Sequence, residues 1–150
     1  MPRALRTLLP DGVFHVTARG VARGTIFRDD TDYNLFRAQL LRVARKSEWT
    51  LHAYCLMPNH YHLIVEAEQA KLSRGMQRLN AGYATAFNER HGRVGHLFQG
   101  RFASRVIDDH EHFERALAYV VNNPIAAGLC SEDEQWPWTD MARSDPGQVP

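Results

Sequence analysis

The chain has 150 residues, of which 44% are hydrophobic, and a formal net charge of +1 at pH 7. This length suits one domain with a sizeable core, and the apolar fraction together with the absence of low-complexity tracts argues for a folded globular protein. No apolar run approaches the roughly 18 residues of a membrane-spanning helix, and the N-terminus lacks the apolar segment of a signal peptide. Without a secretion signal, we expect Cys55 and Cys130 to be reduced and buried rather than paired. We therefore predict a cytoplasmic protein without membrane contact, forming one domain over residues 1–150 with a C-terminal tail from about residue 131.

The small net charge hides a strong asymmetry along the chain. Residues 1–107 hold 16 Lys and Arg against 8 Asp and Glu, whereas residues 108–150 hold 2 against 9. Nearly all of the basic residues are arginines, whose planar guanidinium suits recognition of phosphates and base edges. A basic body with an acidic C-terminal segment is compatible with nucleic-acid binding. Arginine bias from a GC-rich genome explains the same composition, so charge alone leaves both interpretations open.

The N-terminal third predicts a strand, a glycine-punctuated loop and a helix. Residues 12–17 alternate apolar and polar side chains, which is typical of a strand with one buried face. The following loop, residues 18–24, contains two glycines with Arg19 and Arg23, and fits either a phosphate contact or a plain connection. Apolar residues then recur at helical spacing behind a group of aspartates that can cap a helix, so we predict a helix from about Thr31 to Lys46.

A hairpin carrying two histidines is predicted next. Residues 50–56 read as a second strand, Pro58 and Asn59 as a turn, and the apolar run from His60 as a third strand. Side chains at i and i+2 of a strand share one face, so His60 and His62 stand together. Two adjacent imidazoles can seed a divalent-metal site if other residues add ligands. An ordinary strand with one buried and one exposed histidine is the alternative.

The next segments predict a helix and a basic loop. Leu72, Met76, Leu79, Tyr83 and Phe87 mark one face of a helix for which Ser73 is a candidate N-cap. Its polar side includes Arg74 and Arg78, by default a solvated surface. Residues 91–102 combine glycines, arginines and aromatics, which suits a loop that follows a single-stranded nucleic acid. A loop that caps the core with buried phenylalanines fits equally well.

The C-terminal part predicts a short strand over residues 104–107 and a third helix. Asp108 or Asp109 is expected to cap this helix and Pro124 to end it. Tyr119 and Asn123 lie four residues apart, on one face of the helix. A tyrosine in this position is more often a core residue with a satisfied hydroxyl than a nucleophile. We expect the two C-terminal tryptophans, residues 136 and 138, to pack on the body and the chain from about Ser144 to be mobile.

Several ordered segments resemble the HUH superfamily of single-strand DNA nucleases, named for its histidine–hydrophobe–histidine motif. Within that superfamily the chain is most similar to single-tyrosine insertion-sequence transposases, especially the REP-associated tyrosine transposases. The resemblance spans about residues 3–140 and rests on segments 14–20, 26–30, 52–62, 72–77, 95–102, 119–124, 127–129 and 136–138. Several motifs at the family spacing are far more specific than one histidine pair.

The resemblance implies a fold and a site. The fold is α+β and ferredoxin-like, a central antiparallel sheet with helices packed on it, the histidines on a middle strand and the tyrosine on a helix beside the sheet. The predicted order, β-α-β-β-α-β-α, agrees with it. His60 and His62 match the metal-binding histidines, Tyr119 matches the nucleophile, and Asn123 matches a further metal ligand. The implied ion is Mg²⁺ or Mn²⁺.

The resemblance also implies a reaction and its substrate. Attack of Tyr119 on a DNA phosphate would leave a 5′-phosphotyrosine and a free 3′-OH, and a second 3′-OH could reverse the step and join strands. The implied partner is single-stranded DNA with a nearby hairpin, which would place the protein at the nucleoid. The candidate DNA contacts are Arg19, Arg23, Arg74, Arg78, Gln99 and Arg101. Histidines 52, 91, 96, 110 and 112 are expected to be structural or on the surface, with His96 the strongest exception.

Two other functions and two assembly states stay open at this point. A domesticated protein could bind hairpin DNA without cutting it, although a pure binder need not keep all of His60, His62, Tyr119 and Asn123. A metal-dependent phosphodiesterase could use water as the nucleophile, with Tyr119 structural. Both monomers and homodimers occur among the similar proteins, so the resemblance decides neither the assembly state nor whether the tyrosine serves its own subunit.

Overall fold

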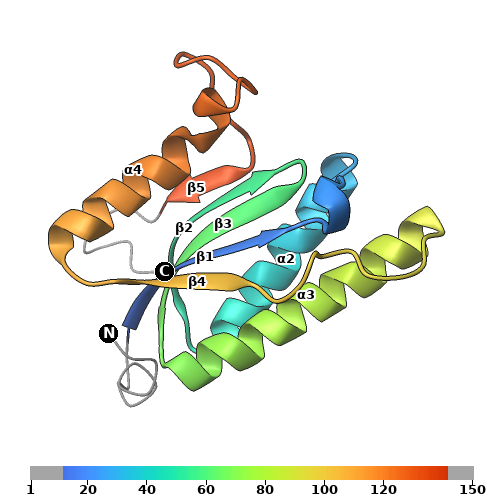
Figure 1. Ribbon diagram of the computed structural model, residues 1–150, viewed down its shortest axis with the longest axis horizontal. Coiled ribbons are helices and arrows are strands. Elements are labelled where there is room, and N and C mark those ends of the chain that lie inside the picture. The colour runs from blue at the N-terminus through green and yellow to red at the C-terminus, as the bar shows by residue number, and fades with distance from the viewer. Residues whose placement is uncertain (1–11, 142–150) are drawn as a thin grey trace.

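Five antiparallel strands form one sheet with helices on both faces in the computed structural model, which describes residues 12–141 (Figure 1). The strand order is β4-β1-β3-β2-β5, so the strand with the two histidines is the central one, as predicted. The strands are β1 (Gly12–Arg19), β2 (Thr50–Met57), β3 (His60–Ala67), β4 (Ala103–Ile107) and β5 (Thr139–Met141). The helices are η1 (Val21–Arg23, a 3-10 turn), α2 (Asp30–Lys46), α3 (Gln69–His91) and α4 (His110–Ala126). The predicted α+β fold is confirmed.

The two faces of the sheet carry different cores, as the period-2 alternation of β1 predicts. Phe14, Val16 and Ala18 of β1 are buried in a large aromatic core beneath α2 and α3. A smaller core on the opposite face packs under α4 and includes Ala116 and Val120 of that helix. Figure 1 shows α4 on the side of the sheet away from α2 and α3. The polar members of the β1 alternation therefore face α4.

The histidine hairpin forms as predicted. β2 and β3 pair antiparallel out to Met57 and His60, with Pro58 and Asn59 forming the turn between them. In the pairing of β1 with β3, Arg19 lies opposite His60 and Thr17 opposite His62. Residues directly opposite one another in a sheet share a face. Both histidines therefore belong to the face that α4 covers.

Two predicted helix boundaries are wrong. α3 begins at Gln69, four residues before the proposed cap Ser73, because tertiary contacts hold its first turn: the Trp49 indole donates to the Lys71 carbonyl at 3.2 Å. α4 continues through Pro124 to Ala126. A proline in the last turn removes one intrahelical donor, and its own carbonyl still accepts a hydrogen bond from Leu129 N at 2.9 Å. The predicted caps of the other two helices, by Asp29 and Asp109, are confirmed.

The C-terminal segment packs on the sheet and adds a strand that was not predicted. The Trp136 indole donates to the Leu56 carbonyl at 2.7 Å, and Trp138 stacks on Tyr33 with ring centroids 4.7 Å apart. β5 then pairs with the outer edge of β2. The predicted packing of the tryptophans is confirmed, whereas the predicted mobility from Ser144 falls outside the described residues. The single-domain assignment for residues 1–150 stays a prediction.

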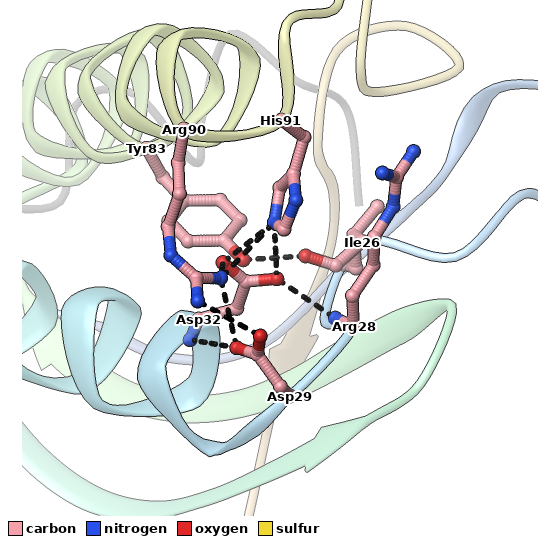
Figure 2. A network of polar contacts seen from close by, with 7 residues as sticks. All are labelled: Ile26, Arg28, Asp29, Asp32, Tyr83, Arg90 and His91. Atoms are coloured by element: carbon pink, nitrogen blue, oxygen red, sulfur yellow. Dashed lines mark hydrogen bonds and ion pairs between the residues drawn. The ribbon is translucent and has the colours of Figure 1, made fainter.

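A buried carboxylate joins the start of α2 to the end of α3 (Figure 2). Asp32 is completely buried, and it accepts hydrogen bonds from Arg28 N at 2.8 Å, from the Arg90 guanidinium at 2.9 Å and from His91 Nε2 at 2.8 Å. Arg90 also pairs with Asp29, the N-cap of α2, at 2.9 Å. A buried charge is tolerated only when it is paired and hydrogen-bonded. This network therefore holds the two helices of one layer in register.

The remaining predictions concern the cysteines and the membrane. Both cysteines are free, as predicted, with Cys55 buried and Cys130 only half-buried. Burial raises the pKa of the Cys55 thiol to about 11. Within residues 12–141 no helix has the length and apolar character required to cross a membrane.

Candidate active site

A basic cleft of about 1250 Å³ lies on the α4 face of the sheet, and His60, His62 and Tyr119 of the predicted site line it, whereas Asn123 is not among its lining residues. This volume exceeds the roughly 300–1,000 Å³ of typical small-molecule pockets. Five arginines and four histidines line the cleft, and no Asp or Glu is among its lining residues within the described chain. The lining side chains include His15, Thr17, Arg19, Arg23, Asn59, His60, His62, Gln99, Arg101, Arg105, His112, Arg115 and Tyr119. A cleft of this size and charge suits an extended anionic ligand.

Tyr119 reaches the cleft because of its position on α4. Ala116 and Val120 are buried against the sheet, which leaves Tyr119 on the flank of the helix with 56% of its surface exposed. Its ring centroid lies 5.6 Å from that of His62 and 5.8 Å from that of His15. The tyrosine therefore combines an accessible hydroxyl with two neighbouring imidazoles from the chain's own strands.

Asn123, one helical turn beyond Tyr119, comes together with His60. Burial lowers the pKa of His60, and the nearby Asn123 side chain opposes this shift. The structure therefore places His60, His62, Tyr119 and Asn123 in one region, as the spacing on strand and helix predicted. Their roles in metal binding and catalysis stay predictions.

Asn59 fixes the orientation of His60. Its amide nitrogen donates to the Arg23 carbonyl at 3.3 Å, so its amide oxygen faces His60 Nδ1, 2.8 Å away. An amide oxygen only accepts, so Nδ1 of His60 must carry the proton. The neutral ring then keeps a lone pair on Nε2, which is the atom able to bind a metal.

His62 is oriented by a third histidine, His15 of β1, which lies at a diagonal cross-strand position. His62 Nδ1 and His15 Nε2 are 3.0 Å apart. Burial, with smaller contributions from the charges of His60 and His15, lowers the pKa of His62 to about 3, so its ring is neutral at physiological pH. If Nδ1 of His62 donates to His15, the lone pair of His62 lies on Nε2, as metal binding requires.

The donor set fits a divalent metal. Two neutral imidazoles and one amide are available, and each imidazole has a partner on its Nδ1 atom, which is the arrangement that orients metal-ligating histidines. No group of three or more His, Cys, Asp or Glu between residues 12 and 141 is arranged to hold a metal ion. Metal binding by His60, His62 and Asn123 stays a prediction. Mg²⁺ prefers oxygen ligands, so the two imidazoles favour Mn²⁺.

Four of the six predicted DNA contacts line the cleft. Arg19, Arg23, Gln99 and Arg101 lie at the end of the cleft that also holds His60, and Arg19 Nε donates to Gln99 Oε1 at 3.3 Å. Their segments are joined by an isolated bridge between Gly20 and Phe98. Arg74 and Arg78 are exposed on α3, and neither is among the residues that line the cleft. DNA contact by any of the six stays a prediction.

The loop of residues 20–24 is tightly constrained at this end of the cleft. A Cβ on Gly20 would lie 2.1 Å from the Gly24 carbonyl oxygen, so a larger residue would clash with backbone. Ala22 and Arg23 have φ of 53° and 59°, in the left-handed region that L residues adopt at a cost. Such strain occurs often at functional sites, which agrees with a binding role for Arg23.

The 91–102 loop contributes both to the core and to the cleft. Leu97 and Phe98 are buried, as the core-capping interpretation proposed, whereas Gln99 and Arg101 line the cleft. His96 is exposed and is not among the lining residues.

Sequence reasoning missed His15, Arg105 and Arg115, and it set His112 aside as structural or on the surface. All four line the cleft. His15 stands opposite Arg105 in the pairing of β1 with β4. Burial, then the charges of Arg105 and His112, lower the pKa of His15. His15 is one of the polar residues that alternate with apolar residues along β1, and this alternation was the only sequence feature that pointed to it. Interpreting that feature required knowledge of which strands pair with β1.

The chain belongs to the family described as "Transposase IS200 like", whose model matches residues 10–123. The fold agrees with this class, and its antiparallel sheet presents the paired histidines beneath a helix that carries a tyrosine. Within this class the chain is similar to REP-associated tyrosine transposases. It is 24% identical over 131 residues to a putative REP-associated tyrosine transposase of Haemophilus influenzae, covering 79% of this chain and 74% of the relative. It is 20% identical over 115 residues to the REP-associated tyrosine transposase of Escherichia coli K12, covering 75% and 67%.

Two solved structures share the fold. A REP-associated tyrosine transposase bound to a REP hairpin superposes with a TM-score of 0.68 at 20% identity, covering 93% of this chain and 82% of the other. A putative transposase from Deinococcus radiodurans superposes with a TM-score of 0.54 at 16% identity, covering 77% and 92%.

Proposed function

We propose that this transposase-family protein is a single-strand DNA endonuclease and strand transferase that uses Tyr119 as its nucleophile. The observation that carries the proposal is the position of Tyr119, exposed in a basic cleft with its ring 5.6 Å from that of His62. A tyrosine that served only the core would bury its ring, as the fully buried Tyr61 and Tyr83 do.

The proposed step is an in-line transesterification at a DNA phosphate. The Tyr119 Oη–P bond forms as the P–O3′ bond breaks, the phenolic proton is lost to solvent, and the leaving 3′ oxygen is protonated to 3′-OH. The product is a 5′-phosphotyrosine, which conserves the bond energy, so that a second 3′-OH can attack it and rejoin strands. A phenol is a weak nucleophile until it loses its proton, so attack is favoured by a strongly cationic surrounding, which the cleft arginines provide.

His60, His62 and Asn123 would hold the divalent ion, Mg²⁺ or Mn²⁺. When bound, the ion supplies positive charge at the scissile phosphate as negative charge builds up there. His60 and His62 contribute as neutral ligands, because burial lowers the pKa of each ring. Asn59 and His15 keep those rings in place through their Nδ1 atoms. We expect Mn²⁺ to support faster cleavage than Mg²⁺, and equal rates with the two ions would contradict this donor preference.

The proposed substrate is single-stranded DNA that bears a hairpin. The structurally similar REP-associated transposase was solved bound to a REP hairpin, and the cleft of the present chain has five arginines and no acidic lining residue. Phosphate neutralisation by arginines supplies most of the sequence-independent affinity for DNA. The cleft charge therefore supports a nucleic-acid substrate, while the likeness supports the hairpin.

A covalent-adduct assay tests the function. The protein is incubated with 5′- and 3′-labelled hairpin DNA and Mn²⁺, and products are resolved under denaturing conditions. We expect a protein–DNA adduct on the fragment with the 5′ end at the cut, and its loss in Tyr119→Phe. Tyr54→Phe, on the other face of the sheet, is the matched control and should keep the adduct. Binding without cleavage would support a hairpin-binding protein, and cleavage that survives Tyr119→Phe would support a water nucleophile.

A further inference from the structure

The cleft has a second cationic end that the predicted DNA contacts do not include. Arg105 of β4 and Arg115 of α4 line it together with His112. His15 and Arg105 are paired opposite one another, and Arg19 is four residues beyond His15 along β1. At about 3.3 Å per strand residue, the positions of His15 and Arg19 lie about 13 Å apart along β1. Tyr119, beside His15 and His62, lies between the two cationic ends.

Arg105 and Arg115 are not neutralised by the protein. Within residues 12–141 neither arginine has an ion-pair partner. Glu111 lies four residues before Arg115, a spacing at which opposite charges often pair on a helix. These two residues form no ion pair in the described chain, and Arg115 lines the cleft instead. Two unpaired guanidinium groups in one cleft add to its positive potential, which favours an anion there.

We propose that Arg105 and Arg115 form a phosphodiester-binding site of their own, which holds the strand on the side of Tyr119 opposite to Arg19, Arg23 and Arg101. The proposal rests on the proposed single-stranded DNA substrate. A strand lying along the cleft would be held at both ends, and its central phosphate would be presented to Tyr119. Guanidinium groups suit this role because they donate two parallel hydrogen bonds to phosphate oxygens.

The test measures binding apart from cleavage. Fluorescence anisotropy with labelled oligo-dT of increasing length, in a Tyr119→Phe background, reports affinity for a strand without a hairpin. We expect affinity to rise with length until the strand reaches both ends of the cleft. In the double variant Arg105→Gln/Arg115→Gln the affinity should stop rising at a shorter oligonucleotide length. The slope of log K against log salt should also become shallower by about 0.7 for each arginine removed.

Controls separate this site from general charge and from stability. Arg42→Gln removes an exposed arginine of α2, on the other layer of the fold, and should change neither the length dependence nor the salt slope. Thermal unfolding of each variant verifies that it is folded. An Arg105/Arg115 double variant whose length dependence and salt slope match the parent would overturn the proposal, as would a parent that binds no oligo-dT.

The outcomes also separate this site from the proposed function. If the wild-type protein forms no adduct but its oligo-dT binding depends on Arg105 and Arg115, the phosphate site is supported and the catalytic proposal is contradicted. If the protein forms the adduct but its oligo-dT binding does not change when both arginines are replaced, the catalytic proposal is supported and the phosphate site is contradicted.

Discussion

His15 Nε2 lies 3.0 Å from His62 Nδ1, across the two strands that form the floor of the cleft. This contact joins His15, to which the sequence analysis assigned no role, to a histidine of the histidine–hydrophobe–histidine motif. The partner on Nδ1 sets the tautomer and the orientation of a ligating imidazole, so in the proposed metal site His15 would act through His62.

Replacing His15 with alanine is expected to weaken Mn²⁺ binding by about 10- to 100-fold, the usual effect of removing such a partner. His15→Gln, whose amide can accept from Nδ1 of His62, should recover part of the loss. Isothermal titration calorimetry at constant pH measures both. His110→Ala, at an exposed histidine, is the matched control. An unchanged Mn²⁺ affinity in His15→Ala would remove His15 from the site.

Tyr119 lies beside the histidines of its own chain, which predicts that each chain cleaves with its own nucleophile. A mixture of Tyr119→Phe with a His60→Ala/His62→Ala variant should therefore show no adduct above that of either variant alone. The denaturing-gel assay for the adduct measures this directly. Recovery of cleavage in the mixture would mean that tyrosine and histidines come together from two chains, and would imply a dimer.

Removing the buried carboxylate of Asp32 should destabilise the fold without touching the cleft. Asp32→Ala leaves the Arg28 amide and the His91 ring without their acceptor, at a cost of about 2 to 3 kcal/mol. Chemical denaturation followed by tryptophan fluorescence measures the change. Asp30→Asn, at the exposed neighbouring aspartate, should cost less than about 1 kcal/mol, the range for a charge near a helix N-terminus. Equal effects of the two substitutions would contradict the role assigned to the network.

The ion pair between Asp29 and Arg90 predicts how stability falls in acid. The hydrogen bond from Arg90 holds the pKa of the Asp29 carboxyl below its usual 3.8. A depressed carboxyl pKa adds stability that is fully present above about pH 4 and is lost as the pH falls through the lower folded value. The difference in melting temperature between wild type and Arg90→Gln should therefore narrow below pH 4. A difference that stays constant from pH 6 to pH 2.5 would contradict this linkage.

The local order of the fold was predictable because each element carried its own signal. Alternation marked β1, helical spacing and Asp29 marked α2, and a turn between two apolar runs marked the histidine hairpin. β5 was missed because three residues cannot display a period, and only its pairing with β2 makes it a strand. The start of α3 was missed because Trp49, distant in sequence, stabilises its first turn.

The site was predictable only where the chemistry is local in sequence. His60 with His62, and Tyr119 with Asn123, are short-range pairs, and their positions on a strand and a helix brought the two pairs together. His15 and Arg105 were not recognised because their relevance depends on strand register: β1 lies between β3 and β4, so it brings residues 15, 62 and 105 to one face. A single sequence without pairing information does not contain that register.

The C-terminal strap, residues 136–141, also bears on whether the chain can exchange parts with a second copy. It follows α4 and ties that helix to the sheet edge through the Trp136 indole and the pairing of β5 with β2. Trp138 of the strap stacks on Tyr33 of α2, so the strap also contacts the helix layer on the opposite face of the sheet. Domain swapping of α4 would require both tryptophans to leave their sites and β5 to separate from β2. These contacts oppose a domain swap of α4, so they favour keeping Tyr119, the proposed nucleophile, with its own chain.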